Sequence, residues 1–335
     1  MNDSTTVNSS APSLQGLSRV AARVGVAIIV WVLIRIACEF LTIPIASYLK
    51  AVGSTNDTIQ VVSLAVSAAG AYLIGTPVAL WILGVFQNRG LRGMFQKSSL
   101  PARELLAAIP MAYTVTITLN LIATVILTLA HGSVNEVLEQ NPFLNLATSN
   151  LAVALNYLWM VIAAPVFEEL LFRGGVLTAL KPYGNWFAVI VSALLFGLSH
   201  VNISQMLYAT ALGVVLGMVR VKSGSVAPGI IMHLCINFLG ITVATLYSLE
   251  IMALLVPVVA LVLTALISGI VLLIVSIMRR RDRFQLENNA PELSKKEKLG
   301  GLLRSPLFVV MFLLTLSIGI AINIPGIMRL FTTGA

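Results

Sequence analysis

Nine apolar stretches, separated by short polar segments, constrain the fold of this chain more than any other feature of its sequence. Most of them reach the roughly 20 consecutive apolar residues that a helix needs to cross a bilayer. Only 10% of the 335 residues are charged, against about 25% in an ordinary soluble domain. The sequence therefore predicts an all-α, multipass transmembrane bundle of about eight or nine helices. The stretches begin near Gly25, Gln60, Glu104, Asn150, Asn185, Gln205, Val226, Ile251 and Pro306.

Basic residues alternate between the loops. If the N-terminus is cytoplasmic, all but three of the 21 lysines and arginines fall on the cytoplasmic side; the exceptions are Arg35, Lys50 and Arg329. The positive-inside rule therefore places the N-terminus in the cytoplasm and, with nine helices, the C-terminus outside. The net charge of +8 then indicates loops that touch anionic lipid headgroups and not a nucleic-acid partner.

These patterns divide the chain into four parts. We expect a disordered cytoplasmic tail over residues 1–24, N-terminal transmembrane helices over 25–149, a four-helix catalytic core over 150–248, and C-terminal transmembrane helices over 249–335 that carry a basic cytoplasmic loop at 279–305. The polar loop from His131 to Asn150 fits either a segment lying on the outer membrane surface or a short lid.

Ionisable residues inside the apolar stretches are functional candidates, because a charge at mid-bilayer costs at least ~2.5–3.5 kcal/mol. Arg35 and Glu39 lie four residues apart in the first stretch. One helical turn separates them, so we expect a structural ion pair; a role in a substrate path or proton relay is the alternative.

The segment "APVFEELLFRGG", residues 164–175, carries two adjacent glutamates. Successive helical residues point about 100° apart, so Glu168 and Glu169 face different sides. Glu169 precedes Arg173 by one turn, in the favourable order for an ion pair. Glu168 has no partner on its own helix and must find water, a histidine or a metal elsewhere.

Two further segments place polar groups one turn apart. In "FGLSH", Phe196 precedes His200, and in "HLCIN", His233 precedes Asn237. Three helices can therefore bring Glu168, both histidines and Asn237 to one cavity. His200 reaches the depth of the other three only if its helix starts well outside the hydrocarbon, which places the turn after it inside the membrane, against protein or a water-filled cavity.

This set of groups suits hydrolysis. A glutamate and a histidine can hold and deprotonate a water molecule, and a histidine with an asparagine can donate hydrogen bonds to a developing oxyanion. Inside a membrane the natural substrate is a peptide bond. The sequence lacks an H-E-x-x-H zinc helix, and its three aspartates, Asp3, Asp57 and Asp282, lie in tails or loops.

The three segments, "EELLFR", "FGLSH" and "HLCIN", resemble the E-E-x-x-x-R, F-x-x-x-H and H-x-x-x-N motifs of the CAAX protease and bacteriocin-processing family, also called the Abi family. The resemblance extends from about residue 164 to 237. It implies intramembrane proteolysis of membrane-associated or lipidated peptides.

Carried over by motif, the resemblance implies that Glu168 and His200 activate water, that His233 and Asn237 form the oxyanion site, and that Glu169 and Arg173 support the helix. Zinc on Glu168, His200 and His233 and a metal-free, glutamate-activated water are both compatible with the sequence. Two other functions stay open: a non-catalytic membrane scaffold or immunity protein of the same family, and a transporter with a Glu/His proton relay, which the lack of broken-helix repeats disfavours. The oligomeric state and the substrate are not predicted.

Overall fold

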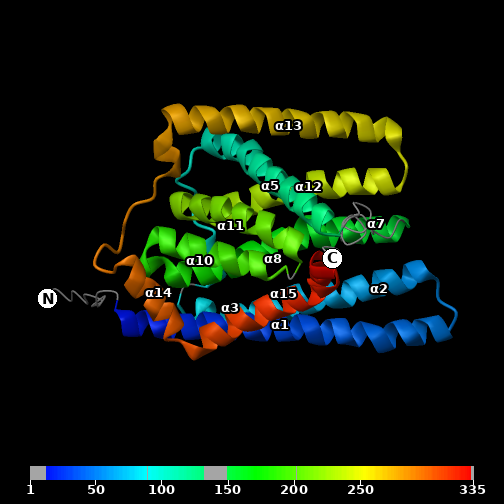
Figure 1. The fold of residues 1–335 in the computed structure, drawn as a ribbon, viewed down its shortest axis with the longest axis horizontal. Helices are drawn as coiled ribbons and strands as arrows, with labels where there is room; N and C mark the ends of the chain where they lie inside the picture. The colour runs from blue at the N-terminus through cyan, green and yellow to red at the C-terminus, as the bar shows by residue number, and fades with distance from the viewer. Residues whose placement is uncertain (1–12, 89, 132–148, 201, 333–335) are drawn as a thin grey trace.

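The computed structural model describes residues 13–88, 90–131, 149–200 and 202–332, and within them every regular element is a helix (Figure 1). The predicted all-α class is confirmed. The loop predicted between His131 and Asn150 lies outside the described residues, apart from His131, Ser149 and Asn150. The elements in chain order are α1 Leu14–Ala51, α2 Asn56–Ala68, η1 Ala69–Gly75, α3 Thr76–Ile82, α4 Val85–Asn88, η2 Leu91–Met94, α5 Ala102–His131, α7 Asn150–Asn156, η3 Tyr157–Ala163, α8 Ala164–Glu168, η4 Glu169–Leu177, α9 Thr178–Leu180, η5 Lys181–Tyr183, α10 Asn185–Leu198, α11 Ile203–Ser223, α12 Ala227–Ser248, α13 Met252–Arg279, η6 Arg281–Phe284, α14 Lys295–Leu303 and α15 Pro306–Thr332.

Seven helices in the described part of the chain are long and apolar enough to cross a bilayer, and an eighth span is formed if α14 and α15, bent by 84° at their junction, count as one. All nine predicted stretches are helical. The predicted stretch that does not form a span is α10, because its 14 residues rise only about 21 Å and do not cross a hydrocarbon core about 30 Å thick.

The N-terminal tail is shorter than the sequence predicts. Residues 1–24 are expected to be disordered, but α1 begins at Leu14, where the side chain of Ser13 accepts a hydrogen bond from the backbone N–H of Gly16. Leu17, Ala21 and Val24 are fully buried on one face of this first part of α1. An N-cap and an apolar face therefore extend the helix into a segment whose polar composition predicts a tail.

The candidate site lies on one long, irregular helix that runs from α7 to α9. Two π-helical segments interrupt it: η3 ends just before α8, and η4 begins at Glu169, directly after Glu168. π-helical segments shift the register of the side chains that follow and are frequent at functional sites. Gly174 and Gly175 fall within η4, where added Cβ atoms would lie 2.5 Å from the sulfur of Met94 and 2.7 Å from Leu83. The glycines thus admit side chains of the neighbouring segments.

Helices α10 and α11 form a close hairpin beside this irregular helix (Figure 1). Gly213 allows the approach, because a Cβ there would lie 2.9 Å from the Cα of Ala193, and at Gly217 it would meet Val189 at 3.1 Å. Small residues at such a crossing let two helix backbones pack together in a membrane. Since α10 is short, its C-terminal turn carries His200 into the interior of the bundle.

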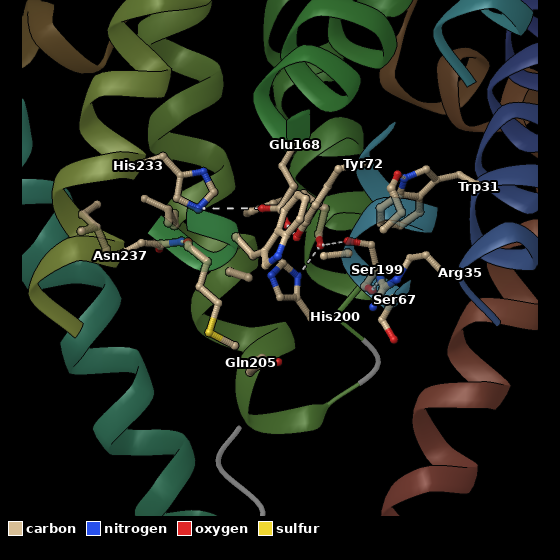
Figure 2. A pocket seen from close by; sticks show the side chains of 18 of the residues that line it. Trp31, Arg35, Ser67, Tyr72, Glu168, Ser199, His200, Gln205, His233 and Asn237 are labelled. Atoms are coloured by element: carbon tan, nitrogen blue, oxygen red, sulfur yellow. Dashed lines mark hydrogen bonds and ion pairs between the residues drawn. The ribbon is translucent and has the colours of Figure 1, made fainter. Parts of the chain in front are cut away.

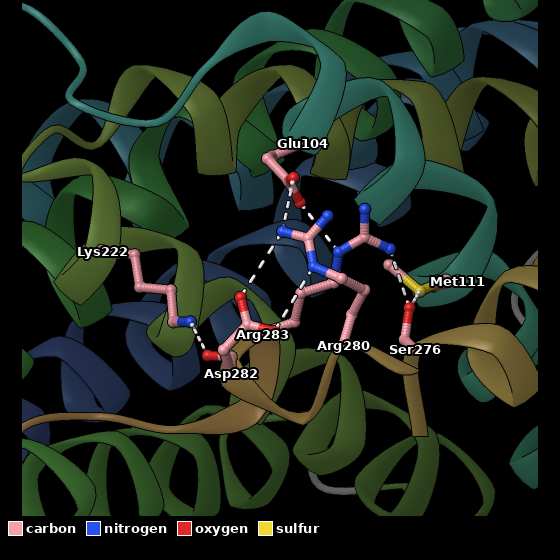
Figure 3. Close-up of polar contacts among 7 residues, drawn as sticks. All are labelled: Glu104, Met111, Lys222, Ser276, Arg280, Asp282 and Arg283. Carbon is pink, nitrogen blue, oxygen red and sulfur yellow. Dashed lines mark hydrogen bonds and ion pairs between the residues drawn. The ribbon is translucent and has the colours of Figure 1, made fainter. Parts of the chain in front are cut away.

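Polar contacts join several connections at one end of the bundle (Figure 3). The Ser99 hydroxyl donates to the carbonyl of Lys222 at 2.7 Å, and Nζ of Lys222 donates to the carbonyl of Asp282 at 2.9 Å. Glu104, at the start of α5, forms an ion pair with Arg283 at 2.9 Å. The connections before α5, after α11 and after α13 therefore meet at the same end, which carries basic residues assigned above to one side of the membrane.

Candidate active site

One cavity of about 390 Å³ brings together the four residues that the sequence singles out. Glu168 from α8, His200 from the turn after α10, and His233 and Asn237 from α12 all line it (Figure 2). The turn that holds His200 thus borders a cavity, which is the condition expected for such a turn at membrane depth. The geometry places these groups together, and their catalytic roles remain predictions.

Glu168 holds the central position. Its side chain is 14% exposed, and its Oε2 lies 3.9 Å from Nε2 of His233. On the other side, the hydroxyl of Tyr72 donates a long, weak hydrogen bond of 3.5 Å to Oε1. The ring of Tyr72 is stacked on Phe167, with an interplanar angle of 17°. Glu168 therefore faces the cavity between an imidazole and a phenol, with room for a water molecule.

Glu169 lies behind the cavity and contacts two partners. Its Oε1 is 2.8 Å from Nη1 of Arg173 and 3.4 Å from Nδ1 of His233, and the carboxylate and the guanidinium are both fully buried. Neither carboxylate oxygen accepts a hydrogen bond of ordinary geometry from a described group, so the attraction to Arg173 is mainly ionic. The predicted pair of Glu169 and Arg173 is present, and it also reaches His233, which the sequence does not predict.

The tautomer of His200 follows from its hydrogen bond. Nδ1 lies 2.9 Å from the backbone carbonyl of Phe196, and because a carbonyl oxygen only accepts, Nδ1 carries the proton. In the neutral ring Nε2 is then left with its lone pair, as a base or ligand requires.

Asn237 is oriented by the irregular helix. Its Nδ2 donates to the carbonyl of Met160 in η3 at 2.8 Å. The amide group carries two N–H bonds, so one remains for a group in the cavity. Asn237 lies one turn after His233 on α12, and the two side chains line the same wall (Figure 2).

Phe196 connects these residues. Its ring, 1% exposed, lies edge-to-face with His200 at 5.0 Å and with His233 at 5.7 Å. The guanidinium carbon of Arg173 lies 4.3 Å from its centroid, within the range of a cation–π contact. One aromatic side chain therefore fixes both histidines and the buried arginine.

The N-terminal helices complete the cavity, and the sequence interpretation missed most of their contribution. Trp31, Tyr72 and Ser67 line it, and Nε1 of Trp31 donates to the carbonyl of Ala71 at 3.1 Å. A tyrosine and a tryptophan in apolar stretches are common enough that neither stands out. The only signal was the small-residue run around Gly70, which lets η1 approach α1: a Cβ there would overlap Cys38.

The expected ion pair between Arg35 and Glu39 is wrong. Arg35 donates from Nη1 to the carbonyl of Ser199 at 2.9 Å, and its guanidinium carbon lies 4.9 Å from the centroid of Trp31. Within the described residues no ion pair joins Arg35 to Glu39. Helical spacing permits the pair, but a carbonyl at the end of α10 and an aromatic face offer the guanidinium closer contacts.

The arrangement of these side chains decides whether the cavity fits a zinc ion. A catalytic zinc site takes three protein ligands at about 2.0–2.3 Å. Across the described part of the chain, no group of three or more histidine, cysteine, aspartate or glutamate side chains is placed to hold a metal ion. Glu168, His200 and His233 as arranged do not fit a bound zinc ion, although all three line the cavity.

Fold and site together define a class: helical, multipass membrane proteins in which the helices enclose a cavity lined by a glutamate, two histidines and an asparagine. Residues 148–239 match the family model described as type II CAAX prenyl endopeptidase Rce1-like. This segment is therefore a domain of the CAAX protease and bacteriocin-processing family, a family of intramembrane proteases, and it contains all four residues. Neither the curated proteins nor the solved structures give a match to the chain.

Proposed function

We propose that this protein is an intramembrane endopeptidase that hydrolyses peptide bonds of membrane-associated or lipidated peptides. The observation that carries the proposal is the meeting of Glu168, His200, His233 and Asn237 around one cavity. The matched family is named for prenyl endopeptidases, and apolar side chains of Leu64, Leu212 and Ile236 line the same cavity beside the polar groups. A peptide with an apolar or lipidated segment suits such a lining.

In the proposed reaction, Glu168 removes a proton from a water molecule held between it and Nε2 of His200, and the water oxygen bonds to the carbonyl carbon of the substrate. The free N–H of Asn237 and Nε2–H of His233 stabilise the oxyanion. Nδ1 of His233 faces the carboxylate of Glu169 at 3.4 Å, and a carboxylate only accepts hydrogen bonds, so Nδ1 carries a proton. Donation from Nε2 as well therefore requires a ring with protons on both nitrogens. The carbon–nitrogen bond then breaks, and Glu168 returns its proton to the leaving amine.

The decisive variant is Glu168→Gln, which keeps the shape of the side chain and removes the base. Glu292→Gln is the matched control, since Glu292 is exposed and lies outside the cavity. With a synthetic S-farnesylated peptide ending in a CAAX sequence, and its unprenylated form, we expect Glu168→Gln to lower kcat by at least ~10³-fold, with an unchanged melting temperature. Full cleavage by this variant would exclude the mechanism. A scaffold or immunity protein would instead keep its cellular function in Glu168→Gln.

We also propose that the N-terminus is cytoplasmic and that the cavity opens toward the cytoplasmic leaflet. The support for this orientation of the chain is the positive-inside bias and the meeting of basic connections at one end of the bundle. Single cysteines introduced at Lys97 and at Thr55 test the proposal in a background without Cys38 and Cys235. A membrane-impermeant maleimide added outside intact cells should label position 55 and leave position 97 unlabelled.

A further inference from the structure

Arg35 stands apart from the four predicted residues in both sequence and space. It belongs to α1, outside residues 148–239, and among the described residues that line the cavity it is the sole lysine or arginine. Figure 2 shows Arg35 with Trp31 along one wall of the cavity, whereas His233 and Asn237 lie along the opposite wall, with Glu168 and His200 between them.

Few of the donors of Arg35 are used by the protein. A guanidinium has five N–H donors; Nη1 donates to the carbonyl of Ser199, and one face lies over Trp31. No carboxylate of the described chain lies within 4.0 Å of it, including Glu39 and Glu168, which line the same cavity. The side chain is thus held in place at its neutral contacts and keeps donors for another group.

An arginine without a carboxylate partner is expensive at membrane depth, and such residues mark substrate or ion pathways. The matching ligand is an anion, and a carboxylate fits the planar fork of the guanidinium in a bidentate geometry. The cavity also holds Glu168, which repels an unpartnered carboxylate. A substrate carboxylate therefore binds favourably in this cavity only where the positive charge of Arg35 offsets the repulsion from Glu168.

We propose that Arg35 is a specificity-determining residue that binds a carboxylate of the peptide substrate. The inference rests on the proposed endopeptidase function. In this binding mode the scissile carbonyl of the substrate lies against His233 and Asn237. The substrate carboxylate lies at the opposite wall, beyond Glu168, where it contacts Arg35 (Figure 2). That carboxylate is either the C-terminus of the peptide or an Asp or Glu side chain close to the cleaved bond, since both present the same group.

Three synthetic S-farnesylated peptides that differ only at their C-terminus distinguish these sources: one with a free C-terminus, one with a C-terminal amide, and one with a C-terminal amide and its last residue replaced by glutamate. The variants are Arg35→Gln, which keeps an amide donor for the Ser199 carbonyl, and Arg35→Lys, which keeps the charge. Arg23→Gln is the matched control, because Arg23 is an exposed residue of the same helix and does not line the cavity.

For the protein with Arg35 we expect a KM at least ~10-fold lower for a carboxylate-bearing peptide than for the plain amide, a ratio typical of one charged contact. Arg35→Gln should abolish that ratio, with kcat changed less than about twofold, and Arg35→Lys should restore part of it. Preference for the free C-terminus alone identifies the terminal carboxylate; equal preference for the glutamate peptide identifies any nearby carboxylate. If Arg35→Gln impairs all three peptides equally, Arg35 only positions the His200 turn, and the proposal is wrong.

A binding measurement tests the role of Arg35 independently of whether the protein cleaves peptides. Fluorescent forms of the same peptides are titrated onto the Glu168→Gln protein and onto the Glu168→Gln/Arg35→Gln double variant. Carboxylate-selective binding that disappears in the double variant supports the inference even if the protein cleaves none of the peptides. Cleavage without carboxylate selectivity retains the endopeptidase and overturns the inference, and so does equal or absent binding of all three peptides.

Discussion

Nδ1 of His233 lies 3.4 Å from Oε1 of Glu169, so the glutamate that pairs with Arg173 also contacts a residue of the cavity. Nε2 of the same ring lies 3.9 Å from Oε2 of Glu168. A line of alternating charge and imidazole thus runs from the fully buried Arg173 to the cavity. Groups that contact a reacting side chain from outside the cavity fix its orientation and protonation. We therefore expect Glu169 and Arg173 to orient His233 in addition to stabilising their own helix.

The first prediction concerns this buried pair. Arg173→Met leaves Glu169 without its cation in a fully buried site, and removing one partner of a buried pair costs about 3–5 kcal/mol. We expect a clearly lower melting temperature in detergent and loss of activity. Glu169→Gln should lower both as well, because Arg173 and His233 lose the same partner.

The double variant Glu169→Gln/Arg173→Met supplies the control. It leaves no buried charge unpaired, so its loss of stability should be smaller than the sum of the two single losses. Additive losses would contradict a direct ion pair. Arg23→Gln, at an exposed position of α1, should leave the melting temperature unchanged.

The part of this site that sequence reasoning could predict is local. Spacing along one helix pairs Glu169 with Arg173 and leaves Glu168 unpaired, and both follow from the 3.6-residue period. The contact of Glu169 with His233 joins helices 64 positions apart in sequence, and no helical period describes it. The Arg35 prediction failed for the same reason: spacing offered Glu39, whereas packing offered the carbonyl of Ser199.

The second prediction tests the contribution of the N-terminal helices. Tyr72→Phe removes the hydroxyl that approaches Glu168 at 3.5 Å and keeps the ring stacked on Phe167. The hydrogen bond is long, so we expect a modest decrease in kcat of about 3- to 10-fold, which corresponds to about 1 kcal/mol. The melting temperature should stay within about 2 °C of the parent, as expected for retained packing.

Ser67→Ala is a useful companion variant to Tyr72→Phe, since Ser67 carries another hydroxyl of the cavity lining but donates no hydrogen bond to Glu168, whereas Tyr72 does. If both variants lower kcat equally, the effect of Tyr72 is not specific to the carboxylate. If neither does, η1 only closes the cavity wall.

The third prediction concerns Phe196, whose ring contacts both histidines and Arg173. Phe196→Leu keeps an apolar side chain but loses the aromatic face and edges. We expect a destabilisation of about 1–2 kcal/mol and a decrease in kcat that exceeds any change in KM, because the histidines lose their common support. Phe187→Leu, on the same helix and outside the cavity lining, is the matched control; a similar decrease in kcat there would show that α10 packing alone is responsible.

The depth of His200 shows how far sequence patterns reach in the fold. Because His200 lies 15 residues after Asn185, the sequence predicts that it reaches the depth of the other site residues only if the helix starts outside the hydrocarbon. The turn after the helix then lies inside the membrane. The structure supplies the means: α10 ends at Leu198 and packs tightly on α11 through Gly213 and Gly217. The apolar stretch is visible in the sequence, but its length alone does not reveal that it is a half-span. Only the packing of the hairpin fixes where it stops.

The last prediction separates the metal-free reaction from zinc chemistry. The described side chains do not form a three-ligand group, and the proposed base is Glu168 itself. We therefore expect purified, active protein to contain clearly less than one zinc per chain by elemental analysis, and cleavage of the farnesylated peptide to survive prolonged dialysis against a chelator. His200→Ala should still lower kcat strongly, because Nε2 is lost as an acceptor for the water. One zinc per chain, removed together with activity and restored with it, would instead require the cavity to close around Glu168, His200 and His233 when the ion binds.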